Sequence, residues 1–275
     1  MAANLEFQRV NEWSWLRGFA NLFRKENRAW WGTRRWWINA LIWPLMLGGL
    51  VANMMFVPTI ANLASAEEVA SAGGITAYVI MLGISVFFEF GIQAIGIGAV
   101  ILCQDLLVDE RQSGVAEWLL TKPVTRRAYV LAKLLTNVVF IFLFLIVVPS
   151  IVIYGLFYLR AGEAYSWQPF LSGVGIMALH TLFYITLAVM LGAFTNSRLP
   201  VLGITLGSLL GGGIIGSFVK PALYVTPWML SKMASLVVSG QPVPDGLFWS
   251  PIVATALWCV VFVILAFVKF EKVEF

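Results

Sequence analysis

Charged residues are scarce in this chain. They make up 12% of its 275 residues, while hydrophobic residues make up 60%. A soluble domain carries about twice that share of charge, so the composition excludes an ordinary soluble protein. Histidine occurs once and cysteine twice, with no Cys-x-x-Cys spacing, so no metal site is expected. We interpret Cys103 and Cys259 as apolar filler and His180 as a structural residue.

The chain also lacks the signatures of common enzymes. It contains no phosphate-binding Gly-x-x-x-x-Gly-Lys-Ser/Thr loop, no Gly-x-Ser-x-Gly elbow and no His-Glu-x-x-His motif. The sequence therefore predicts no catalytic residue, no ATPase activity and no cofactor bound by this chain. The net charge of +4 comes without a clustered basic face of the kind that binds nucleic acid, so no nucleic-acid partner is expected.

Six apolar runs are long enough to cross a hydrocarbon core, which needs about 20 residues. Barrel strands are about 10 residues long and alternate in polarity, unlike these runs. The predicted fold is an all-α integral membrane protein with six transmembrane helices, forming one domain over residues 1–275. The predicted spans are Ile38–Val57, Ile75–Leu102, Leu134–Phe157, Ser172–Phe194, Pro200–Phe218 and Pro251–Val268.

The lysines and arginines predict the orientation. Of the 18, only Arg160, Lys220 and Lys232 fall on one side of the predicted bilayer, and the remaining 15 fall on the other. Positive charge accumulates on the cytoplasmic side of membrane proteins. Both termini are therefore expected in the cytoplasm, and the start of the chain has no signal-peptide pattern. We expect a multi-pass protein of the cytoplasmic (inner) membrane.

Two segments flank the spans with helical patterns of their own. Residues 14–37 place aromatic and leucine side chains on one helical face and cationic side chains on the other, which predicts an amphipathic helix lying along the inner leaflet. It is either an anchor only or an elbow helix that also touches a cytoplasmic partner. In the outer loop 219–249, Thr226, Pro227 and Gly240 predict a helix of about 13 residues that dips into or lies on the outer leaflet.

Two features inside the spans have alternative interpretations. Glu89, flanked by Phe87 and Phe90, either contacts a substrate or proton, or is a packed carboxyl bonded to Gln93 or a neighbouring span. The second feature is a glycine seam, formed by Gly203, Gly207 and Gly211 at four-residue spacing. Such a seam allows close helix approach and marks either a subunit interface, a pathway wall, or packing within one subunit.

The charged segment 103–129 stands out between the second and third spans. Ser113 or Gly114 is expected to break the helix that leaves the membrane. Val115–Leu120 then forms a short helix with an acidic first turn, which the helix dipole favours, and Pro123 ends it. A charged segment kept on one side of a bilayer indicates contact with a soluble partner.

This segment resembles the permease subunits of ABC-2 type exporters. Their loop between spans two and three has the pattern Glu, Gly, Glu, two leucines, Pro-Val, a basic residue and Lys. The order of six spans with an elbow helix also agrees, while Val115-Ala116 departs from the usual residues after the glycine. The matching residues are Glu110, Gly114, Glu117, Leu119, Leu120, Pro123, Val124, Arg126 and Lys133.

The resemblance implies a coupling helix that docks in a groove of a separate ATP-binding subunit. Glu110 and Glu117 would then face basic residues of that subunit, and Leu119 and Leu120 would fill its groove. The turn 195–200 with Arg198 would be a second contact. ATP and magnesium would be bound by two copies of the ATP-binding subunit. A second permease chain, identical or paralogous, would complete the complex in the lipid bilayer.

The expected function is therefore ATP-driven export, with a hydrophobic or amphiphilic cargo such as a drug, lipid or lipid-linked glycan, because few charged groups lie in the spans. Two alternatives stay open. A secondary transporter or channel would need more intramembrane charge and matching broken helices. A membrane scaffold subunit would recruit a complex without transport.

Overall fold

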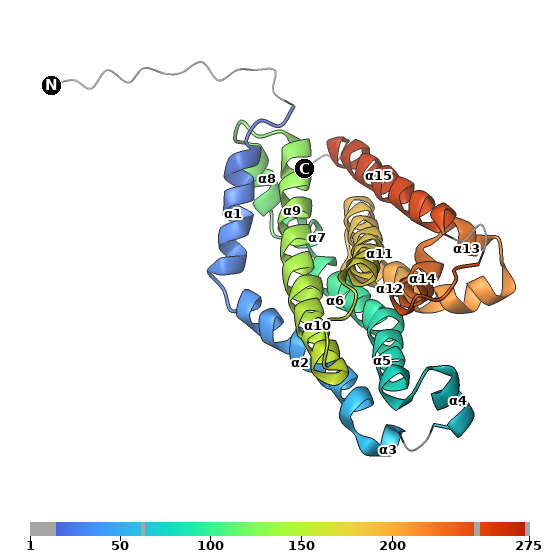
Figure 1. Cartoon of the computed structure of the whole chain (residues 1–275). Coiled ribbons are helices and arrows are strands. Elements are labelled where there is room, and N and C mark those ends of the chain that lie inside the picture. Colours follow the sequence, from blue (N-terminus) through green and yellow to red (C-terminus); the bar gives the residue numbers. More distant parts are fainter. Residues whose placement is uncertain (1–14, 62–63, 245–247, 273–275) are drawn as a thin grey trace.

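The structure is a bundle of helices. The computed structural model describes residues 15–61, 64–244 and 248–272, and no strand occurs within them. Figure 1 shows the bundle with an end that carries α8 and an opposite end that carries α4, called here the α8 end and the α4 end. Six helical runs are long and apolar enough to span a membrane, so the predicted fold class is confirmed. The runs are Arg35–Phe56 (α2), Ile75–Gln112, Arg126–Ala161, Trp167–Phe194 (α11), Arg198–Phe218 (α12) and Trp249–Glu271 (α15).

Two of the runs contain several elements. The second run comprises α5 (Ile75–Ser85), a π-helical turn η1 (Val86–Gly91), α6 (Ile92–Cys103) and α7 (Val108–Gln112). The third comprises α9 (Arg126–Ile141), a π-helical turn η2 (Phe142–Val147) and α10 (Val148–Ala161). The shorter elements are α1 (Phe19–Trp31), α3 (Pro58–Ala61), α4 (Ala66–Ser71), α8 (Val115–Leu120), α13 (Ala222–Val225), the 3-10 turn η3 (Pro227–Met229) and α14 (Leu230–Ser239).

The second and third runs are longer than the predicted spans. They contain 38 and 36 residues, which at a rise of 1.5 Å per residue gives about 57 Å and about 54 Å. A hydrocarbon core is only about 30 Å thick. The surplus extends past the apolar stretch and carries α7 and the start of α9 away from it. Hydropathy predicts the part of a helix that lies in lipid, but it does not predict the part of the same helix that continues beyond the membrane.

The helix α11 lies at the centre of the bundle. It packs against α6, α9, α12, α14 and α15, and most of its length is buried. The helices α2 and α6 approach each other closely at Gly98 of α6, because a Cβ atom there would lie 2.2 Å from the ring of Trp43 of α2. The packing therefore brings helices far apart in the sequence to one core.

The elbow helix differs from its prediction. Of the predicted segment 14–37, residue 14 lies outside the described residues, α1 covers Phe19–Trp31, and Trp36 and Trp37 belong to α2. The buried side chains of α1 pack on α9, where the ring of Trp30 stacks on that of Phe140 at 4.9 Å. Figure 1 shows α1 alongside α9. Protein covers much of the face that was assigned to lipid. An amphipathic pattern cannot distinguish a helical face buried against protein from one buried in lipid, so the sequence did not predict this packing.

The segment between α12 and α15 folds back into the bundle. After the short helix α13, the turn η3 starts at Pro227 and leads into α14, which ends at Ser239. The next residue, Gly240, has φ 71°, a left-handed conformation that favours glycine. The helix α14 packs against α11, α5 and η1, and half of its side chains are buried. Residues 245–247 of the predicted loop 219–249 lie outside the described residues. This helix is therefore part of the core and does not lie on the surface.

Candidate functional site

The helix break in the charged segment lies at Gly114. Its φ of 72° is left-handed, a conformation that glycine adopts without the steric cost of a Cβ atom. The chain leaves α7 at Gln112, turns at this glycine and starts α8 at Val115. The two short helices therefore form a compact unit at the α8 end of the bundle (Figure 1).

A cluster of charged groups holds α7 against α1 and α9. Glu110 of α7 lies between Lys25 of α1 and Lys133 of α9, with Nζ–Oε1 distances of 2.9 Å and 3.1 Å. Glu26 of α1 lies 3.3 Å from both ammonium groups. The hydroxyl of Tyr129 donates a hydrogen bond of 2.7 Å to the second oxygen of Glu110. These five residues are called the ionic cluster below.

The ionic cluster is balanced in charge and largely buried. The side chain of Lys133 is 6% exposed, and a buried charge is tolerated only when partners compensate its lost hydration. Burial lowers the pKa of Lys25, but Glu110 and Glu26 outweigh this effect and raise the pKa above its ordinary value. Two cations and two carboxylates therefore join three separate elements at one point.

The position of Glu110 changes the role that the resemblance implied. Its carboxylate was expected to face basic residues of another subunit. It instead contacts Lys25, Lys133 and Tyr129 of its own chain. Because both oxygens already have partners, Glu110 positions α7 rather than presenting a free charge. The lysine and tyrosine partners come from distant helices, and the sequence alone does not pair them.

On its other side, α7 is held by Arg111. Its guanidinium donates to the carbonyls of Gly192 (2.7 Å), Ala193 (3.4 Å) and Thr195, at the end of α11. The last carbonyls of a helix have no partner within it and carry partial negative charge, so a cation stabilises them. The Gln112 amide adds a hydrogen bond of 2.7 Å to the Asn196 carbonyl. These contacts fasten α7 to the turn after α11.

The predicted second contact, the turn 195–200, lies against the same element. Arg198 at the start of α12 pairs with Asp109 of α7, with an Nε–Oδ1 distance of 2.8 Å. Both side chains are about half exposed. The turn and the charged segment therefore form one continuous region. The short helix α7 lies between α1 and α9 on one side and the α11–α12 turn on the other.

The start of α9 contacts both ends of the described chain. Arg126 donates to the carbonyls of Glu271 (2.6 Å) and Phe270 (3.3 Å) at the end of α15. Arg127 forms an ion pair of 2.5 Å with the Glu271 carboxylate. Thr125 donates to the carbonyl of Trp15 at 2.8 Å. Arg126 was predicted to contribute to coupling, and it caps α15.

One face of α8 stays open. Trp118 is 61% exposed, and the ammonium of Lys122 lies 3.6 Å from the centre of its ring. Val115, one turn before Trp118, and Glu117 are also exposed. Val115, Glu117, Trp118 and Lys122 are called the α8 surface below. Tryptophan is enriched among the residues that contribute most to protein–protein contacts, so Trp118 makes this surface a candidate contact site.

The leucines of α8 do not belong to this surface. Leu119 is 7% exposed and lies in the core of the chain, and Leu120 is half-buried. Both leucines were expected to fill a groove of the partner, and this expectation is corrected for Leu119, which packs within its own chain. Residues three apart share a helical face, so Ala116 and Leu119 face inward while Val115 and Trp118 face outward. The spacing groups Val115 with Trp118 in the sequence, but only the packing of α8 shows that this pair faces outward.

Inside the membrane, Glu89 lies in the π-helical turn η1. It is half-buried and has no hydrogen bond or ion pair to another described residue. The predicted bond to Gln93 is not formed, and the buried Oε1 of Gln93 has no described partner. Phe90 is exposed, whereas Phe87 is fully buried in the core and lines no open pathway here. A role for Glu89 in a pathway stays a prediction.

The glycine seam faces outward from α12. A Cβ atom at Gly203, Gly207 or Gly211 would meet nothing within 4 Å. One at Gly212 would meet the ring of Trp228 at 2.1 Å. The seam therefore makes no close contact within this chain, unlike the next glycine. Its surface is available to lipid or to a second protein.

Metal ligands are not gathered anywhere in the described part of the chain, where no group of three or more His, Cys, Asp or Glu side chains is placed to bind an ion. The groups that do converge lie around α7. Their contacts are structural hydrogen bonds and ion pairs, and the open α8 surface lies beside them. This arrangement suits mechanical contact with a partner.

Comparison with known families agrees with this arrangement. The sequence profile of a family described as ABC-2 family transporter protein matches residues 20–275, which is nearly the whole chain. A search of curated proteins finds no match. The family profile covers α1, all six spans and the charged segment between the second and third spans. On this match, the chain belongs to the ABC-2 family of transporter proteins.

Proposed function

We propose that this chain is the membrane-spanning permease subunit of an ATP-driven export complex. Two copies of a separate ATP-binding subunit would bind ATP and magnesium, and this chain would bind neither. Closure of those subunits would push on α8 and move the membrane spans. The family supports a membrane permease, and the α8 surface supports a soluble partner at that end.

One observation carries the proposal: one face of α8 is exposed, while the adjoining α7 is fastened to four other elements. Ion pairs and hydrogen bonds join α7 to α1, α9, the end of α11 and the start of α12. A load applied to α8 would therefore pass into several spans at once. A loose loop would absorb the same load by bending. This connection is what an energy-coupling segment requires.

The proposed orientation places the α8 end in the cytoplasm. Both termini would lie there, and the protein would be a multi-pass protein of the cytoplasmic membrane. The exposed arginines Arg24, Arg28, Arg34 and Arg35 lie on α1 and the start of α2, where they would meet the headgroups of the inner leaflet. Glu67 and Glu68 of α4 would lie outside the cell.

The α8 surface gives the first test of the proposal. Trp118→Ala is expected to weaken binding of the ATP-binding subunit by about 2 kcal/mol, roughly 30-fold in Kd, because buried interface tryptophans contribute about that much. The measurement is the Kd of the detergent-purified chain for that subunit, together with the ATP turnover of the complex. The matched control is Trp249→Ala at the start of α15, since Trp249 is 70% exposed but lies away from α8. Equal Kd values for both variants would refute the α8 surface as the contact.

The second permease chain is proposed to pack on the glycine seam. Gly207→Leu is expected to abolish dimers while leaving one chain folded, since nothing in this chain occupies the added space. Light scattering of the detergent-solubilised protein measures the mass. Gly175→Leu is the control, because Gly175 is an exposed glycine of α11 with equal free space. Dimers that persist with Gly207→Leu would assign the seam to lipid.

The cargo is proposed to be hydrophobic or amphiphilic. Glu89 is the one acidic residue in the middle of a span, and the surrounding η1 turn is otherwise aromatic and apolar. A strongly hydrophilic ion would need more polar groups than this to replace its hydration. Uptake of a lipophilic dye into inverted vesicles that contain the complex tests this class. Uptake that requires ATP supports it, and ATP-independent uptake would favour a secondary transporter instead.

A further inference from the structure

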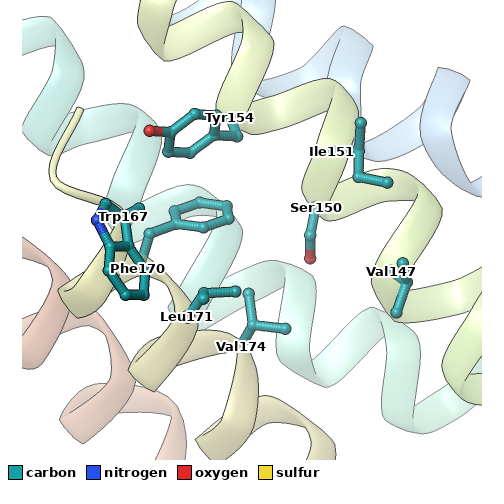
Figure 2. A pocket seen from close by; sticks show the side chains of 8 residues that line it. All are labelled: Val147, Ser150, Ile151, Tyr154, Trp167, Phe170, Leu171 and Val174. Carbon is teal, nitrogen blue, oxygen red and sulfur yellow. The ribbon is translucent and has the colours of Figure 1, made fainter. Parts of the chain in front are cut away.

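A membrane-facing pocket lies between the third and fourth spans, away from the ionic cluster and the glycine seam. Its cavity volume is about 350 Å³, and its walls come from the end of η2, from α10 and from α11. Figure 2 shows its eight lining side chains. Small-molecule sites typically have volumes of about 300–1,000 Å³ and mostly apolar walls with few polar groups. The size and lining of this pocket agree with such a site.

The pocket lining contains one buried polar group without a partner among the described residues. Ser150 is 5% exposed, and its hydroxyl has no hydrogen bond among the described residues. Serine and threonine in a helix usually bond to the carbonyl four residues earlier, as Ser172, Thr181 and Thr205 do here. Figure 2 shows the Ser150 hydroxyl pointing into the space between α10 and α11. A buried hydroxyl left unpaired is costly, so a partner from outside the chain is expected.

The walls around Ser150 are held in place by the protein. The ring of Phe170 is buried and packs edge-on against Tyr154, with ring centres 5.1 Å apart. The hydroxyl of Tyr154 donates a 2.6 Å hydrogen bond to the carbonyl of Tyr165. The pocket is therefore preformed. A ligand would not have to order these side chains when it binds.

The chemistry of the lining selects the ligand. None of the eight described lining residues is charged, and a charged group would lose its hydration here without compensation. Exposed Ile151 and Leu171 leave the pocket open on the side that faces the membrane. A ligand would therefore enter from the bilayer and would be neutral. Its single polar group would meet Ser150.

We propose that this pocket binds a neutral, lipophilic small molecule that carries one hydroxyl or carbonyl group. The apolar body lies between Phe170 and Val174 on α11 and Val147 on the opposite wall, and the polar group exchanges a hydrogen bond with Ser150. An alcohol serves both as donor and as acceptor toward a serine hydroxyl. The site is separate from the α8 surface and does not depend on an ATP-binding subunit.

Photolabelling of the chain alone tests the site. The full-length protein in phosphatidylcholine nanodiscs is irradiated with 3-azioctanol, an octanol that carries a photoreactive diazirine, and labelled peptides are identified by mass spectrometry. Labelling within residues 147–174 is expected to saturate and to be displaced by excess octanol. Ser150→Ala is expected to raise the half-saturating concentration about fivefold, the effect of one neutral hydrogen bond.

Two variants make the result decisive. Val174→Phe fills the pocket and is expected to abolish saturable labelling. Ser172→Ala, which removes an exposed serine outside the pocket lining, is expected to leave it unchanged. Labelling that rises linearly with probe, or that is the same in Ser150→Ala and Val174→Phe as in the unchanged protein, would show a groove filled only by acyl chains. That result would overturn the proposal and leave the proposed function untouched.

Discussion

Lys133→Met is expected to lower the free energy of unfolding by about 3 kcal/mol, because removing one partner of a buried ion pair leaves an uncompensated charge. Glu110 and Glu26 both lie within 3.3 Å of the Lys133 ammonium. After the substitution two carboxylates share Lys25 alone. SDS titration of the protein in dodecyl maltoside micelles measures the loss.

The charge balance of the ionic cluster predicts a partial rescue. Glu110→Gln alone leaves two lysines with one carboxylate, but Glu110→Gln combined with Lys133→Met leaves the balanced pair Lys25 and Glu26. The double variant is expected to be more stable than the sum of the single losses by about 2 kcal/mol. Glu117→Gln, an exposed carboxylate on α8, is the control, with a change within about 0.5 kcal/mol. Strictly additive losses would show that the four charges do not act together.

Arg111→Ala is expected to have the largest effect on coupling. The variant removes hydrogen bonds from a cation to three carbonyls at the end of α11. A hydrogen bond with a charged partner contributes about 1.5–3 kcal/mol, so the fourth span would lose its strongest contacts with α7 and keep the Gln112–Asn196 hydrogen bond. We expect the complex with the ATP-binding subunit to assemble and to hydrolyse ATP. Its rate of cargo transport is expected to fall to less than about a tenth of the normal rate, a change equivalent to about 1.4 kcal/mol.

A neighbouring ion pair supplies the control for Arg111. Arg198→Ala breaks the contact with Asp109, but both side chains are about half exposed. Exposed ion pairs contribute about 0–1 kcal/mol, so stability should change little, and transport should fall much less than with Arg111→Ala although one contact between α7 and α12 is lost. If Arg198→Ala impairs transport as much as Arg111→Ala, general damage to the turn explains both. Transport at the normal rate with Arg111→Ala would refute the role of α7 in linking the spans.

The number and type of spans were predictable from the sequence. Six apolar runs predict six helices because lipid offers no hydrogen-bond partners to the backbone. In a helix, the backbone N–H and C=O groups pair with each other. The short helix Val115–Leu120 was predicted with its observed bounds, because Gly114 and Pro123 are strong local signals. These features depend on residues close together in the chain.

Side-chain partners were not predictable in this way. Leu119 and Trp118 are adjacent in the sequence, yet one is in the core and the other is exposed. Glu110 matches a family pattern, but its lysine partners lie 85 residues earlier and 23 residues later in the chain. The elbow helix has an apolar face in either environment, and only the packing of α9 shows that protein covers part of it.

The membrane class, the six spans and the position of the charged segment near Glu110 follow from the order of residues alone. Hydropathy, helix breakers and charge act between residues that are close together in the chain, so these features can be predicted from the sequence. The packing of the helices, in contrast, fastens α7 on two sides, exposes Trp118 rather than Leu119, and leaves the Ser150 hydroxyl without a partner among the described residues. Those outcomes depend on which distant helices meet, and burial then determines which side chains remain free to contact another molecule.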